Sequence, residues 1–127
     1  MDDKNRKLTD DVKFGKVNCD EAYVENQDGK SKADSWMTVA DYIYEMSDDS
    51  DQFVILTLAD IAYNIRYVQA VQVESGINVQ IGIEEGDNTK LVEKICSEEE
   101  CIDIFQEFYE SSYVRDIEQY TPVKFWV

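Results

Sequence analysis

The sequence predicts an α+β fold: an antiparallel β-meander of about four to five strands with two main helices packed on one face. Apolar residues recur at helical spacing in two segments, residues 35–46 and a stretch that begins after Ser97. Between them lie strand-like segments of apolar or alternating residues, joined by short turns. Helices on one face of such a sheet bury both apolar surfaces.

Length and composition favour one domain. The chain has 127 residues, of which 43% are hydrophobic and 12% aromatic, enough for one buried core. We expect a single α+β domain over residues 13–127, preceded by a disordered polar tail, residues 1–12. No apolar run approaches the ~20 residues that span a bilayer. No secretory signal segment is visible either, so we expect a cytoplasmic protein that binds no membrane.

The first third of the domain gives one clear element. Apolar residues within residues 13–25 are compatible with short strands, and residues 26–32 are predicted to form a loop. A helix is predicted over residues 35–46, and Asp34 or Ser35 can cap its N-terminus through a side-chain oxygen. Its apolar stripe consists of Trp36, Val39, Ala40, Ile43 and Met46.

Three strands are predicted in the middle of the chain. Residues 52–59 are an apolar run of strand length, which indicates an interior strand. Residues 65–73 and 77–83 alternate instead, so each should bury one face. On the first of these two strands the apolar face should comprise Ile65, Tyr67, Val71 and Val73, with Gln69 as a polar exception on the same face.

The turn between these two strands follows from the hydrophobic pattern. A three-residue loop, residues 74–76, pairs Val73 with Ile77 and keeps the two apolar faces together. Such a loop requires a left-handed residue, which Gly76 supplies.

The last part of the chain is predicted to be strand, helix and strand. A glycine turn leads to a strand over residues 89–96. Ser97 and Glu100 form a capping box that begins a helix, which ends near residue 112. Residues 120–127 are predicted to be a short edge strand or a docked tail.

Composition excludes several kinds of chemistry. The chain contains no histidine, so Ser-His-Asp and Cys-His catalysis and histidine-ligated zinc or haem are excluded. The formal net charge is −16, and such a surface repels the phosphates of nucleic acids. The three cysteines, Cys19, Cys96 and Cys101, lack metal-site spacing and are predicted to be buried thiols. We therefore expect no enzyme activity, cofactor or metal, and no nucleic-acid partner.

The acids predict an interaction surface. The second helix carries four acids at positions i, i+3, i+7 and i+10, and the first helix with its following loop carries five more. Like charges at such spacings repel one another. Solubility is one reason to keep them, and a docking face for a basic partner, anchored by a nearby aromatic, is the other. The predicted partner-binding residues are Asp41, Glu45, Asp48, Asp49, Asp51, Glu100, Asp103, Glu107 and Glu110.

The stretches QFVILTLADIAYNIRYVQA and SEEECIDIFQEFYES resemble bacterial immunity proteins in style and element order, over roughly residues 35–125. Such proteins accompany polymorphic toxins, including those of contact-dependent growth inhibition systems. The resemblance implies a stoichiometric inhibitor that binds the C-terminal domain of a cognate protein toxin. That domain is often a nuclease, and it is expected to be basic because it must hold phosphate.

Two other classes of function remain open. A nucleic-acid mimic, of the anti-restriction or anti-CRISPR type, would inhibit a DNA- or RNA-binding protein. It needs carboxylates at phosphate spacing along a long, duplex-like face. An enzyme with carboxylate-only chemistry would need a buried acid with a strongly raised pKa inside a pocket.

Overall fold

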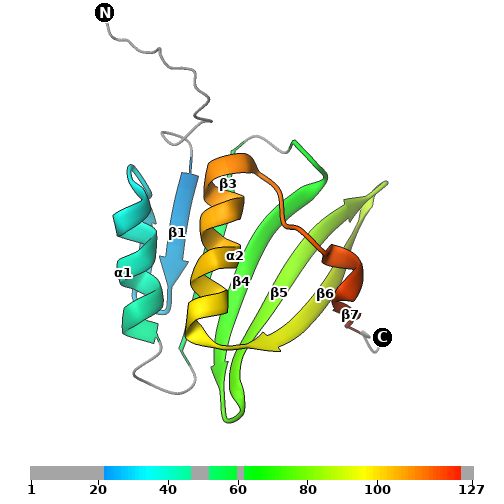
Figure 1. Ribbon diagram of the computed structural model, residues 1–127. Coiled ribbons are helices and arrows are strands. Elements are labelled where there is room, and N and C mark those ends of the chain that lie inside the picture. The colour runs from blue at the N-terminus through cyan, green and yellow to red at the C-terminus, as the bar shows by residue number, and fades with distance from the viewer. Residues whose placement is uncertain (1–21, 47–51, 60–61, 124–127) are drawn as a thin grey trace, which may run out of the picture.

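Seven antiparallel strands form one sheet in the order β2-β1-β3-β4-β5-β6-β7 (Figure 1). The computed structural model describes residues 22–46, 52–59 and 62–123. The predicted tail, residues 1–12, lies outside the described residues. The strands are β1 (Ala22–Asn26), β2 (Gly29–Lys32), β3 (Phe53–Leu58), β4 (Ile65–Val73), β5 (Gly76–Glu85), β6 (Asn88–Cys96) and β7 (Thr121–Pro122).

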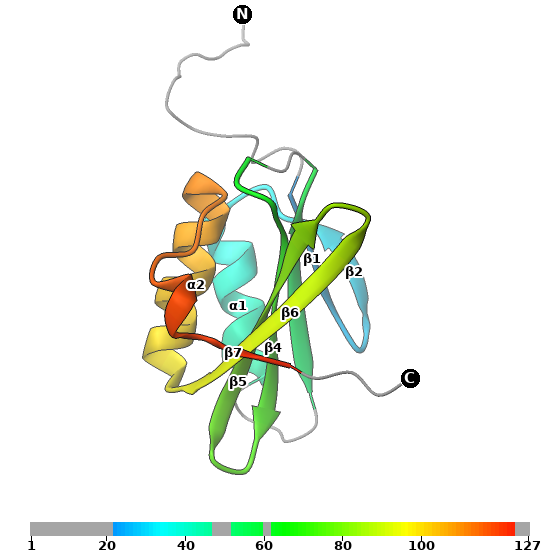
Figure 2. The same cartoon turned by 90° about the vertical axis from the view of Figure 1, so that its right-hand side faces the viewer.

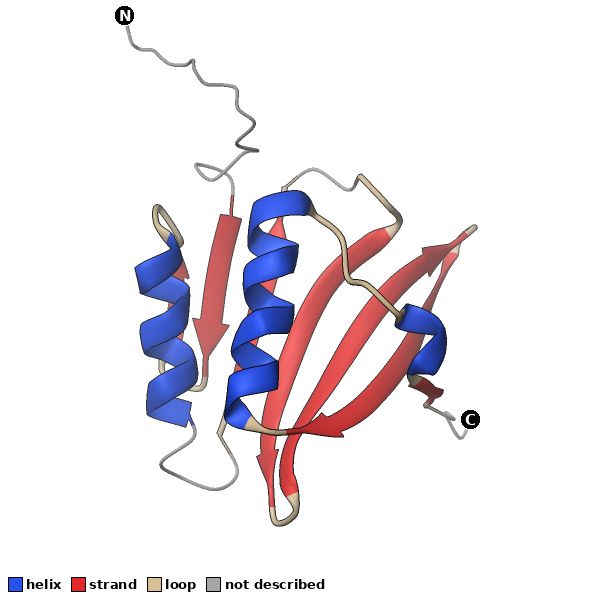
Figure 3. Cartoon of the chain, viewed as in Figure 1, coloured by secondary structure: helices blue, strands red, loops and turns tan. Residues whose placement is uncertain are grey.

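Two helices, α1 (Trp36–Met46) and α2 (Glu98–Ser111), cover the same face of this sheet (Figure 2). A short 3₁₀ helix, η2 (Ile117–Gln119), lies between α2 and β7 (Figure 3). The predicted α+β class and the placement of both helices on one face are confirmed. Neither helix in the described part of the chain is long and apolar enough to cross a membrane.

The sheet has more strands than the four to five predicted. Residues 26–32 were expected to form a loop, yet they contain the turn and second strand of the β1–β2 hairpin, in which Val24 lies opposite Ser31. All four residues of β2 are exposed and none is apolar, so this strand leaves no hydrophobic pattern in the sequence. Backbone pairing with β1 holds it in place. At the other edge, β7 pairs with β6 through only two residues.

The turn between β4 and β5 is one residue shorter than predicted. Val73 lies opposite Gly76 rather than Ile77, so residues 74 and 75 alone form the loop. Gly76 has φ +145°, and a Cβ atom there would lie 2.9 Å from the carbonyl oxygen of Cys96. Glycine is therefore favoured on two grounds: a positive φ is rare for residues that carry a side chain, as predicted, and β6 passes close to this backbone. The residue begins β5, however, and is not part of the loop.

The predicted apolar face of β4 is also wrong, because the strand contains an irregularity. The β4–β5 register shifts between Ile65 and Tyr67, as at a β-bulge. A bulge reverses which side alternate residues face. Ile65, Val68 and Ala70 are consequently buried, whereas Tyr67 and Val71 are only half-buried.

The core lies between the two helices and the sheet. Phe105 and Phe108 of α2 are completely buried, as is Ile43 of α1. They are joined there by buried strand residues such as Leu56 of β3 and Ile81 of β5. The predicted apolar stripes of both helices therefore face the sheet.

Both ends of α2 are fixed by local hydrogen bonds. The backbone N–H of Glu100 donates to Ser97 Oγ over 3.1 Å, which confirms the predicted Ser97 cap. The Glu100 carboxylate, the other half of the predicted capping box, is paired with Lys94 instead. At the other end, Ser112 has a left-handed backbone, φ 63°, and its N–H donates to the carbonyl oxygen of Phe108. A left-handed residue just past a helix is a common way to end it, although glycine usually occupies the position.

An acidic groove beside α2 as candidate functional site

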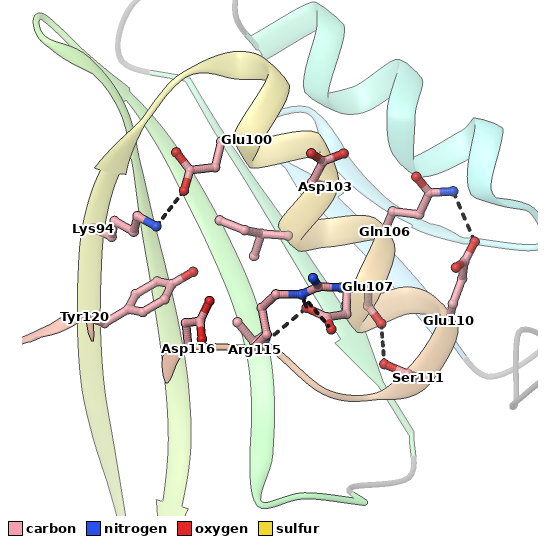
Figure 4. A pocket seen from close by; sticks show the side chains of 12 residues that line it. Lys94, Glu100, Asp103, Gln106, Glu107, Glu110, Ser111, Arg115, Asp116 and Tyr120 are labelled. Carbon is pink, nitrogen blue, oxygen red and sulfur yellow. Dashed lines mark hydrogen bonds and ion pairs between the residues drawn. The ribbon is translucent and has the colours of Figure 1, made fainter. Parts of the chain in front are cut away.

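A groove of about 580 Å³ runs along α2 on the side that faces β6 and β7 (Figure 4). One wall is α2 itself. The other is made by the end of β6 and by the chain between α2 and β7. The whole groove is lined by Lys94, Glu100, Asp103, Ile104, Gln106, Glu107, Glu110, Ser111, Val114, Arg115, Asp116 and Tyr120.

The structure brings the four predicted acids of α2 together. Their spacing places them along one side of the helix, and all of them line the groove: Glu100, Asp103, Glu107 and Glu110. Asp116, from the segment after α2, adds a fifth carboxylate.

The other predicted acids do not belong to this groove. Asp41 and Glu45 are exposed on α1, and neither lines it. Figure 1 shows the reason, since α1 lies beside α2 on the side away from β6. Asp48, Asp49 and Asp51 lie outside the described residues.

Both basic side chains of the groove are already paired with acids of α2. Lys94 Nζ lies 2.5 Å from Glu100 Oε2, and the same ammonium group lies 5.4 Å from the centre of the Tyr120 ring. Arg115 donates to Glu107 from its backbone N–H over 3.0 Å and from Nε over 3.3 Å. Glu107 thereby ties the segment after α2 back to the helix.

Three carboxylates of the groove have no cationic partner within the described part of the chain. Asp103, Glu110 and Asp116 are all exposed. Glu110 accepts a hydrogen bond from Gln106 Nε2 over 3.1 Å, which leaves its charge uncompensated. Because these charges share one concave surface, they attract cations more strongly than the same charges spread over a convex one.

Two thiols and one phenol in and next to the groove are held in their neutral forms. Burial raises the pKa of the Cys96 thiol to about 11, and the Glu100 carboxylate adds to the rise. Burial also raises the pKa values of Cys101 and Tyr120. Cys96 and Cys101 are free buried thiols, as predicted, and neither is a ready thiolate nucleophile at neutral pH. Cys19 lies outside the described residues.

The five carboxylates do not converge on one point. Across residues 22–46, 52–59 and 62–123, no group of three or more acidic or cysteine side chains is arranged to hold a metal ion. The geometry of the groove suits a cationic surface that contacts separate carboxylates along its length.

Sequence reasoning missed the wall of the groove opposite α2. It did not predict Lys94, Arg115, Asp116 or Tyr120, because the segment between α2 and β7 has no apolar period. One signal was present: Lys94 and Arg115 are the only basic residues between positions 91 and 123, an interval rich in acids.

A scan against models of protein families and searches of curated proteins and of solved structures found no match to this chain.

Proposed function

We propose that this chain is an immunity protein that neutralises a cognate toxin domain by covering it, and that the acidic groove receives basic side chains of the toxin. One observation carries the proposal. The two bases of the groove are paired with Glu100 and Glu107, while Asp103, Glu110 and Asp116 remain available on the same concave surface. The resemblance of the sequence to bacterial immunity proteins, in the order of its elements, supports the proposal independently.

The charge of the groove suits rapid capture of a basic protein. Complementary charge steers two proteins together and can raise the association rate by 10- to 1000-fold, roughly, at low salt. A toxin that cleaves nucleic acid must hold phosphate and therefore carries lysine and arginine near its active site. Occlusion of that site inhibits the toxin without any chemistry by the inhibitor, which would act in the cytoplasm where the toxin attacks.

The groove fits a nucleic-acid mimic less well. The row from Glu100 to Glu110 rises only ~15 Å along the helix axis, whereas one turn of a DNA duplex is ~34 Å. Lys94 and Arg115 also place positive charge beside the row. A nucleic-acid backbone presents an unbroken series of negative charges, which a row paired with two cations does not reproduce.

The test exchanges charge inside and outside the groove. The groove variant is Asp103→Lys/Glu110→Lys, which leaves Glu100 and Glu107 and their ion pairs intact. The control is Glu85→Lys/Asp87→Lys at the β5–β6 turn, where both residues are also exposed. Both double variants change the net charge equally, so only the position of the change differs.

Tagged wild-type protein first retrieves its partner from native cells. The partner qualifies as the toxin if its expression alone stops growth and co-expression of this chain restores growth. We expect the groove variant to associate at least about tenfold more slowly and to lose protection, while the control protects. Equal protection by both variants would show that the groove is not the docking site. A partner without toxicity would refute the immunity function itself.

A further inference from the structure

Two exposed tyrosines form an aromatic pair at the end of α2. Tyr63, in the β3–β4 connection, and Tyr113, just after α2, are 58% and 42% exposed. Their ring centroids lie 5.3 Å apart at an interplanar angle of 68°, an edge-to-face arrangement. Two rings that already contact each other lose less side-chain entropy when a partner covers them than two separate rings would, and tyrosine is enriched at interface hot spots.

The backbone around this pair is held in an uncommon conformation. Three non-glycine residues among those described have positive φ: Asn64 at 65°, Ser112 at 63° and Asp116 at 55°. Asn64 is next to Tyr63, and Ser112 is next to Tyr113. Asn and Asp adopt this conformation more readily than other residues, and at Ser112 it ends α2, so the backbone beside each ring follows a defined turn.

Backbone hydrogen bonds hold Ser112 and Asn64 in place. Ser112 is only 3% exposed, and its N–H donates to the carbonyl oxygen of Phe108. The carbonyl oxygen of Asn64 accepts from the N–H of Glu84 over 2.6 Å. The two rings are therefore presented from backbone that is anchored to α2 and to β5.

A short stretch of chain links the pair to the acidic groove. Tyr113 lies in the chain between Ser111 and Val114, which both line the groove. Two of the carboxylates without a cationic partner, Glu110 and Asp116, lie three residues to either side of it in the sequence. The segment that ends α2 therefore carries both an exposed ring and uncompensated carboxylates.

We propose that Tyr63 and Tyr113 form the anchor of the partner interface and that they receive an arginine side chain of the toxin; the inference rests on the proposed function. A guanidinium group is planar, stacks on aromatic faces and presents N–H donors that carboxylates accept. A lysine ammonium group has the same charge but is compact and strongly hydrated, so it gains less from the rings. The juxtaposition therefore selects arginine over lysine.

The test separates this selectivity from general attraction to acid. Octa-arginine and octa-lysine are titrated into the full-length protein at one salt concentration, and calorimetry gives both dissociation constants. The variants are Tyr63→Ala/Tyr113→Ala, Tyr63→Phe/Tyr113→Phe, and the control Tyr44→Ala, which removes a 50% exposed tyrosine from α1. Thermal unfolding checks that each variant is folded.

We expect the wild type and the Tyr44→Ala control to bind octa-arginine about two- to fivefold more tightly than octa-lysine. The double alanine variant should lose this ratio through weaker binding of octa-arginine alone, and the double phenylalanine variant should retain it. An unchanged ratio in the double alanine variant, no preference in the wild type, or no binding of either peptide overturns the anchor. A further outcome is that Asp103→Lys/Glu110→Lys weakens the binding of both peptides equally while the tyrosine variants leave the ratio of the two dissociation constants unchanged. That result would support the acidic groove and refute only the anchor.

Discussion

One of the two helices lines a groove and the other does not, although they lie side by side on one face of the sheet. Both bury an apolar stripe, and both present carboxylates to solvent. The carboxylates of α2 line the groove, whereas Asp41 and Glu45 of α1 lie outside it. Carboxylates along a helix are therefore insufficient to form an acidic groove, because a second wall is needed beside the helix.

The neighbours of each helix explain the difference. Beside α2, the chain returns from the helix end to the sheet edge and brings Arg115 and Tyr120 alongside it. Beside α1 lies the β1–β2 hairpin, and the hydroxyl of Tyr42 donates to Ser31 Oγ over 2.8 Å. The contact on α1 is thus a direct one between a helix and an edge strand.

The largest expected effect is the loss of stability when a buried side chain of α2 is truncated, compared with a smaller truncation on α1. Phe105→Ala removes a completely buried ring of α2 and should lower the free energy of unfolding by about 3–5 kcal/mol. Ile43→Val, at a completely buried position of α1, should cost only about 0.5–1.5 kcal/mol. Urea unfolding measures both. Equal losses would indicate that the ring of Phe105 contributes no more to stability than one methyl group of α1.

A smaller effect concerns the groups below α2 at alkaline pH. The pKa of Cys96 is about 11 in the folded protein against 9.0 ordinarily, because burial disfavours the thiolate. Between these values the unfolded chain loses protons that the folded chain keeps, so stability falls as pH rises through this window. The raised pKa values of Cys101 and Tyr120 act in the same direction.

Melting temperatures from pH 7 to 11 should therefore decline more gently in Cys96→Ala than in the wild type. Ile77→Val is the matched control, because Ile77 lies opposite Cys96 and does not titrate. It should lower the melting temperature by a similar amount at every pH. Parallel curves for wild type and Cys96→Ala would argue against a role for this thiol in alkaline unfolding.

The smallest expected effect concerns the segment after α2, which forms the second wall of the groove. Glu107→Ala removes the acceptor of the Arg115 backbone N–H and guanidinium group. Arg115 is 76% exposed, so the loss of stability should be about 1 kcal/mol or less. Hydrogen exchange of residues 112–116 should accelerate, and Glu107→Gln, which keeps an acceptor, should recover part of the protection. Asp41→Ala on α1 serves as the control. If residues 112–116 exchange equally fast in this control and in Glu107→Ala, Glu107 does not anchor the segment after α2.

Elements with a local cause could be predicted from the sequence. The period of α2 and its Ser97 cap are visible in a few consecutive residues, and the structure confirms both. The burial of Ile77, Val79 and Ile81 likewise follows from simple alternation.

Elements that depend on distant neighbours could not. The irregularity near Arg66 reverses the face of β4, and in the sequence only Gln69, which interrupts the predicted apolar face, is out of step with the alternation. The positive φ of Gly76 could be predicted, whereas the carbonyl oxygen of Cys96 close to its backbone, twenty positions along the chain, could not. In the groove, the α2 acids were predictable from spacing, whereas Asp116 and Tyr120 arrive through a segment without periodicity.

The edges of the sheet bear on how the proposed toxin would bind. Among the described residues, one edge strand is the four-residue β2, whose Lys30 and Lys32 are exposed, and the other is the two-residue β7. Short or lysine-bearing edge strands are poor templates for another chain to extend. Under the proposed function, main-chain pairing at these edges would therefore contribute little to binding. Side-chain shape and charge would then distinguish a correct partner from an incorrect one.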